Sequence, residues 1–168
     1  MKLFDEKFLE DKTRYVLQCI LATLAIFWVL FFLDIISDGI VIASLGASSF
    51  IAFTMPKTQS SKPRFLIGGY CVGIFTGSIF HFIQYVVYNI YRLDITQQSL
   101  GAVFGALTIG TAIFLMVITN TEHPPAAALA LSTAIGNFNI YNILVALIGI
   151  ITLCVIKGIL GRYLKNLL

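Results

Sequence analysis

Four long apolar runs constrain the fold of this chain more than any other feature of its 168 residues. They cover residues 15–33, 65–91, 99–119 and 140–160. An α-helix needs about 20 mostly apolar residues to cross a bilayer, so each run is long enough to span one. Only 11% of the residues are charged, whereas soluble domains carry about 25%. We therefore expect an all-α integral membrane protein.

Two shorter apolar runs lie between the long ones. The first covers residues 39–55 and contains a Gly-Ala-Ser-Ser stretch at 46–49, which we expect to break its helix. The second covers residues 124–135; it begins with two prolines and is followed by a glycine. Short, interrupted segments at matching positions are typical of transporters built from inverted repeats, and they mark the binding site.

The order long, short, long occurs in residues 15–92 and again in residues 97–162. This pattern predicts six transmembrane segments in a 3+3 inverted repeat, within a single membrane domain at residues 15–164. If all six segments cross, ten of the 11 Lys and Arg residues lie on the side of the two termini. Cytoplasmic loops are enriched in these residues, so both termini, including residues 1–14, are expected in the cytoplasm.

The stretch Glu122-His123-Pro124-Pro125 places ionisable groups between apolar runs. Such groups are costly in a membrane domain, so they are expected to pair with other polar groups or to have a functional role. A residue before proline is disfavoured in helical conformation, whereas proline is well tolerated in a first helical turn. We therefore expect one helix to end near Asn120 and the next to begin at Pro124 or Pro125. The free amides of the new helix, near Ala126–Ala128, are expected to form an anion-binding site.

The predicted substrate site combines both short segments, and each of its members also has a purely structural interpretation. His123 either binds an anion and carries a proton, or caps the helix and pairs with Glu122. Glu122 is either a proton acceptor or an interface carboxylate. The predicted substrate-binding residues are His123, Pro124, Pro125, Ala126, Ala127, Gly46, Ala47, Ser48 and Ser49.

The longest apolar run carries two further features. Gly69, Gly73 and Gly77 are spaced four apart and line one helical face, which lets another helix backbone approach closely. His81 and Gln84 lie three apart on one face of the same helix. They either line a proton or substrate pathway, or hydrogen-bond to a neighbouring helix.

Three stretches occur in the order expected for the HPP family, which the chain resembles from about residue 14 to 160. They are residues 46–49, residues 62–69 with Lys-Pro-Arg and Ile-Gly-Gly, and residues 122–128 with the His-Pro-Pro motif. Many relatives are described with four spanning helices. The resemblance implies small-anion transport, because plant and cyanobacterial members are regarded as nitrite transporters. Plant members carry transit peptides and this chain shows none, so a bacterial inner membrane is expected.

The leading hypothesis is a transporter or channel for a small monovalent anion. The resemblance to the HPP family suggests nitrite as that anion. No lysine or arginine lies in the middle of a predicted span, so a phosphate or dicarboxylate would lack fixed charge. The alternatives are a non-transporting membrane subunit that binds a partner through its glycine faces, and an intramembrane metal protein. We expect no enzymatic activity, cofactor, metal site or nucleic-acid partner, and we expect a homo-oligomer in the lipid bilayer.

Overall fold

A computed structural model describes residues 9, 11–33, 39–91, 97–136 and 138–167. Within these residues the chain is all-helical, and the charged N-terminal residues 1–8 lie outside the description. The helices are α2 (Lys12–Leu33), α3 (Gly39–Thr54), the 3-10 turn η1 (Gln59–Ser61), α4 (Pro63–Tyr91), α5 (Gln97–Thr119), α6 (Pro124–Ile135) and α7 (Ile140–Leu160).

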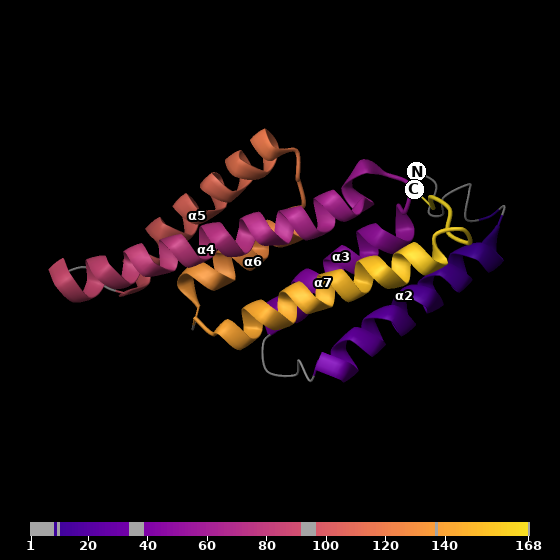
Figure 1. Cartoon of the computed structure of the whole chain (residues 1–168), viewed down its shortest axis with the longest axis horizontal. Coiled ribbons are helices and arrows are strands. Elements are labelled where there is room, and N and C mark those ends of the chain that lie inside the picture. Colours follow the sequence, from indigo (N-terminus) through magenta and orange to yellow (C-terminus); the bar gives the residue numbers. More distant parts are fainter. Residues whose placement is uncertain (1–8, 10, 34–38, 92–96, 137, 168) are drawn as a thin grey trace.

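The helices α2, α4, α5 and α7 are long and apolar enough to cross a membrane. The two short helices lie among them, and α2 and α5 lie on opposite flanks of the bundle (Figure 1). α2 packs against α3 and α7, whereas α5 packs against α4 and α6. At 12 residues, α6 is about 18 Å long, well short of a hydrocarbon core of about 30 Å. The chain is therefore a multi-pass membrane protein whose short helices are enclosed by long ones.

The structure corrects one expectation about α3. We predicted a break at residues 46–49, but α3 is continuous through them. Leu45 is fully buried, and it fills the space where a side chain at Gly149 of α7 would lie. One glycine destabilises a helix by only about 1 kcal/mol relative to alanine. The packing of Leu45 against α7 is enough to offset this cost, so the helix continues.

The glycine face of α4 is confirmed as a site of close helix contact, and its partner is α6. A Cβ atom at Gly73 would lie 2.4 Å from the carbonyl oxygen of Ala126, and one at Gly77 would lie 2.6 Å from that of Ala130. At Gly69 it would lie 2.5 Å from the Cβ of His123. Only glycine permits this approach. The α4 face therefore sets the position of α6 and of the residue that precedes it.

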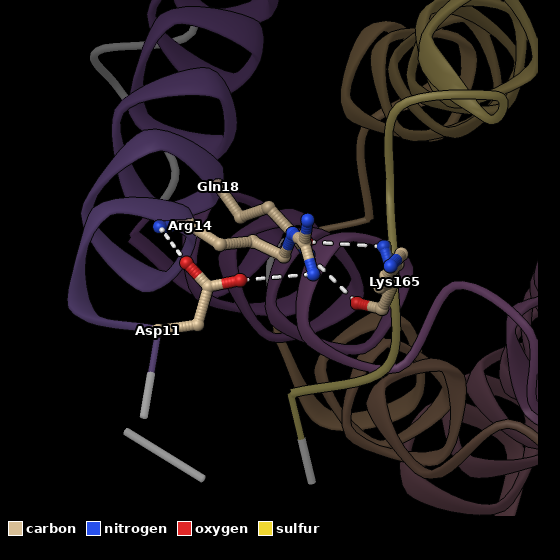
Figure 2. Close-up of polar contacts among 4 residues, drawn as sticks. All are labelled: Asp11, Arg14, Gln18 and Lys165. Atoms are coloured by element: carbon tan, nitrogen blue, oxygen red, sulfur yellow. Dashed lines mark hydrogen bonds and ion pairs between the residues drawn. The ribbon is translucent and has the colours of Figure 1, made fainter. Parts of the chain in front are cut away.

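The C-terminal segment folds back onto the start of α2, at one end of the bundle (Figure 1). Gln18 is 2% exposed, and its amide exchanges two hydrogen bonds with the main chain of Lys165, at 2.9 and 3.0 Å (Figure 2). The same amide nitrogen donates to the carbonyl of Phe53 at 2.7 Å. Beside it, Arg14 pairs with Asp11 at 2.9 Å. One buried glutamine thus ties together α2, α3 and the tail.

Candidate functional site

The connection between α5 and α6 has the predicted shape. α5 ends at Thr119, Asn120 has a positive φ of 54°, and α6 begins at Pro124. His123 is the N-cap residue, with φ −143° and ψ 95° in the extended region, as expected before a proline. The predicted ends of both helices are confirmed, because proline chemistry acts locally.

His123 joins a buried cluster of polar side chains from α3 and α4. Its Nε2 lies 2.8 Å from the Ser48 hydroxyl, and that hydroxyl lies 3.0 Å from the Tyr70 hydroxyl. Tyr70 also lies 2.8 Å from Ser44. Ser44 in turn donates to the carbonyl of Pro125 at 2.9 Å. We call Ser44, Ser48, Tyr70 and His123 the histidine cluster.

The cluster is almost completely shielded from its surroundings. His123 is 1% exposed, Ser44 is 3% exposed, and Ser48 and Tyr70 are not exposed at all. His123 lies in the connection between two helices, outside the four long spans. Burial disfavours the charged imidazole and lowers the pKa of His123 to about 4, although the main chain of Ser60 acts in the opposite direction. The ring is therefore neutral near pH 7.

Proton accounting shows that the cluster has one polar atom to spare. Ser44 donates its only hydroxyl proton to Pro125, so it accepts from Tyr70. Tyr70 gives its only proton to Ser44, so its oxygen can only accept from Ser48. The single proton of Ser48 therefore has three groups within reach: the Ser44 carbonyl at 2.9 Å, the Tyr70 oxygen at 3.0 Å and His123 Nε2 at 2.8 Å. Its choice sets the tautomer of the imidazole. In either tautomer Nδ1 is buried and no hydrogen bond of standard geometry reaches it among the described residues; the main chain of Ser60 makes a weaker hydrogen-bond contact with the ring.

The other predicted residues of α3 are placed differently from Ser48. Ser49 is buried, but the hydrogen bonds of the histidine cluster do not include it. Ala47 is exposed, and nothing lies within 4 Å of a Cβ built at Gly46. Because α3 is a continuous helix, its internal amides are already hydrogen-bonded and are not the free donors that we expected.

The first turn of α6 is less open than we expected. The amide of Ala126 donates to the carbonyl of His123 at 2.9 Å, and Ala126 is fully buried. Pro125 is buried, Ala127 is half-buried and Pro124 is exposed. Glu122 is half-buried, and no hydrogen bond or ion pair connects it to His123 in the described part of the chain.

His81 and Gln84 are not part of the histidine cluster. They line a separate pocket of about 510 Å³ at the other end of α6, together with residues that follow this helix. His81 Nδ1 lies 3.1 Å from the carbonyl oxygen of Ala134 near the end of α6. The structure therefore separates the predicted site residues into two groups, one at each end of the same short helix.

Sequence reasoning missed Ser44 and Tyr70. Ser44 and Ser48 are four residues apart in an apolar helix, so they share one face, and this spacing was the available signal. Tyr70 directly follows Gly69, but nothing local indicates that its hydroxyl points into the protein. Among the described residues, no three His, Cys, Asp or Glu side chains gather as they would around a metal ion.

Comparison with known proteins matches residues 9–167 to the transmembrane region of the HPP family. A curated transmembrane protein of Dictyostelium discoideum is 34% identical to the chain over 98 residues. The aligned part is 58% of this chain and 30% of that protein, so the chain spans less than a third of this relative. No solved structure matches the chain.

Proposed function

The chain belongs to the HPP family of transmembrane proteins, and we propose that it carries a small monovalent anion across a membrane, with nitrite as the first candidate. The observation that supports this most strongly is the hydrogen bond between Ser48 and His123. It joins one short helix to the start of the other inside the core. Buried polar groups in a membrane domain are costly, and they typically mark a pathway.

The chemistry of the cluster suits an anion of low charge. The hydroxyl protons are used inside the cluster, so the donor it can offer an anion is Nδ1–H of His123, and α6 presents the positive end of its dipole beside this ring. No lysine or arginine is among the buried polar residues in the described part of the chain. A monovalent anion can be held by such donors, whereas a phosphate would need fixed positive charge.

We further propose that the anion binds together with a proton. Without a ligand, burial keeps His123 neutral, with a pKa of about 4. An anion beside Nδ1 would favour the imidazolium, and by linkage the proton would favour the anion by the same factor. Together they add no net charge to the buried site. Proton-coupled transport follows from this reciprocity.

The proposed route follows the contact between α3 and α6. At its other end, a small cavity of about 20 Å³ lies among α3, α6 and α7. This is room for about one water molecule. Ser132, Thr133 and Asn139 contribute polar groups to its wall. Leu129 lines this cavity and is itself buried, so apolar packing closes the route in this conformation.

The packing of the helices supports the proposed inverted repeat. Suppose that α2, α3 and α4 correspond to α5, α6 and α7. Each contact between two different helices then has a counterpart when the two halves are exchanged. The α2–α3 contact corresponds to α5–α6, the α4–α6 contact to α7–α3, and the α4–α5 contact to α7–α2. Figure 1 places the start of α2 and the C-terminal segment at one end of the bundle, which suits six crossings with both termini in the cytoplasm of a bacterial inner membrane.

The test is anion flux into proteoliposomes, with nitrite, nitrate, formate, chloride and bicarbonate compared at two internal pH values. We expect nitrite flux that rises when the outside is more acidic, and a loss of at least about tenfold in His123→Ala. Thr108→Val is the matched control, because Thr108 is also buried and its hydroxyl, among the described residues, donates to Phe104 of its own helix and not to another helix. Unchanged flux in folded His123→Ala would contradict the site. Absence of flux for every anion would favour a non-transporting subunit.

A further inference from the structure

The pocket at the far end of α6 has a chemistry different from that of the histidine cluster. It has a volume of about 510 Å³ and opens outward. Its described walls contain neither lysine nor arginine, and neither aspartate nor glutamate. They are formed by His81, Gln84, Tyr85, Tyr88, Asn89, Ala134, Ile135, Gly136 and Phe138.

Three side chains of α4 offer hydrogen-bond acceptors in this pocket. A carbonyl oxygen can only accept, so His81 donates its Nδ1 proton to Ala134, and Nε2 of the neutral ring is an acceptor. Gln84 Oε1 is buried without a partner among the described residues. Asn89 donates its amide nitrogen to the carbonyl of Tyr85 at 2.9 Å, which leaves its oxygen as the third acceptor.

The surroundings add negative potential to these acceptors. α6 ends at Ile135, and the C-terminal end of a helix carries partial negative charge. Aromatic rings also line the pocket: Phe138 stacks on His81 with ring centroids 5.0 Å apart, and Tyr85 and Tyr88 lie on the same wall. The faces of aromatic rings attract cations. The anion that we propose for the other end of α6 is disfavoured here.

We propose that this pocket binds a primary ammonium group. Such a group has N–H donors for the acceptors of His81 and Gln84, which lie one helical turn apart, and the aromatic rings would stabilise its charge. Asn89 lies eight residues, or about 12 Å along α4, from His81, so one ammonium group does not reach both. The ammonium group is supplied either by the headgroup of an aminophospholipid or by a small free amine. Gln84 Oε1 is shielded in the free protein, so the side chain must turn toward the pocket before a ligand donor can satisfy this carbonyl, which is costly to leave unpaired.

Thermal unfolding of the protein in detergent without aminolipid tests the free amine. Ethanolamine is expected to raise the midpoint temperature, because a ligand that binds only the folded state stabilises it. Choline chloride at equal ionic strength is the comparison, since a quaternary ammonium has no N–H to donate. An equal shift with choline would overturn the proposal. The lipid arm compares nanodiscs of phosphatidylethanolamine and phosphatidylcholine, with retained lipid measured by native mass spectrometry.

Two substitutions of one residue give opposite expected results. Gln84→Leu removes an acceptor and is expected to weaken ethanolamine binding about tenfold. Gln84→Glu places a carboxylate at the same position and is expected to strengthen it by a similar factor. Thr108→Val is the control and should leave binding unchanged. If Gln84→Leu does not fold, Gln84→Glu still decides, because weaker or equal binding in that variant contradicts an ammonium site. Neither measurement depends on anion flux.

Discussion

At the scale of single residues, His123 combines complete burial with incomplete hydrogen bonding. Ser48 satisfies Nε2, whereas Nδ1 is buried without a partner in the described part of the protein. A purely structural histidine would be expected to use both ring nitrogens. The spare nitrogen is therefore the atom that separates the two interpretations of this residue, a helix cap and an anion ligand.

The lowered pKa of His123 predicts how the stability of the protein depends on pH. In the unfolded chain the imidazole takes up a proton near pH 6.5, whereas in the folded protein it does so only near pH 4. Between these values the unfolded state binds more protons, so stability falls as the pH is lowered from 6.5 to 4. The loss attributable to His123 is about 3 kcal/mol at most, by the usual 1.36 kcal/mol per pH unit.

The measurement is the free energy of unfolding in detergent across this pH range, for the wild type and for His123→Asn. Asparagine can keep a hydrogen bond to Ser48 but does not titrate. We expect the wild type to lose more stability than the variant as the pH falls from 6.5 to 4. Parallel curves would show that His123 does not carry this pH dependence.

At the scale of helices, α4 and α6 form the closest pair in the fold. The glycines of α4 face the carbonyls of α6, and the first of those carbonyls belongs to Ala126, three residues after His123. The α4 glycine face is thus used inside the chain and is not available to a partner protein. By contrast, Gly110 of α5 is exposed, and a Cβ there would meet nothing within 4 Å.

This difference predicts opposite effects for two alanine substitutions. In Gly73→Ala, the new methyl group would lie 2.4 Å from the carbonyl oxygen of Ala126, so α6 must move. We expect a loss of about 1–3 kcal/mol in the free energy of unfolding, together with reduced anion flux. Gly110→Ala is the control, and it should be neutral or stabilising by up to about 1 kcal/mol. Thermal unfolding of the two purified variants measures both effects, and similar midpoints would contradict the packing argument.

At the scale of the whole molecule, the C-terminal tail closes the bundle at the end where α2 begins. Leu164 and Leu167 are buried, and the amide of Leu167 donates to the carbonyl of Thr54 at 2.8 Å. The tail also reaches the α3–α4 loop, because Asn166 accepts from the amide of Lys57 at 2.9 Å. That loop contains Ser60, whose main chain influences His123. The tail thereby supports the loop beside the proposed site.

Gln18→Leu tests this arrangement, since leucine keeps the bulk of the side chain but cannot bond to Lys165 or Phe53. We expect faster amide hydrogen exchange at Lys165 and Leu167, by about tenfold or more, because one local closing contact of roughly 1.4 kcal/mol is lost. Thr23→Val on the same helix is the control, because the Thr23 hydroxyl donates to Cys19 of α2 and, within the described part of the chain, makes no hydrogen bond to the tail. Unchanged exchange in Gln18→Leu would show that the tail is held by its leucines and its other hydrogen bonds, without Gln18.

The sequence by itself determined the helices, most of their limits and the connection before α6. Bilayer thickness sets how long a spanning helix must be, and the two prolines act within a few residues of their own position. These causes are local, so they can be read along the chain. The continuity of α3 could not be predicted from the sequence, because the contact of Leu45 with α7 outweighs the local helix-breaking tendency of Gly46.

Only the tertiary structure decided which groups meet His123. Ser48 is 75 positions away along the chain, and Tyr70 comes from a third helix. Such contacts depend on how each helix is rotated about its axis, and the close approach of α4 to α6 sets that rotation. The same geometry sends His81 and Gln84 to the opposite end of α6. Residue types and spacing thus indicated the candidates, while packing between distant segments separated them into two sites.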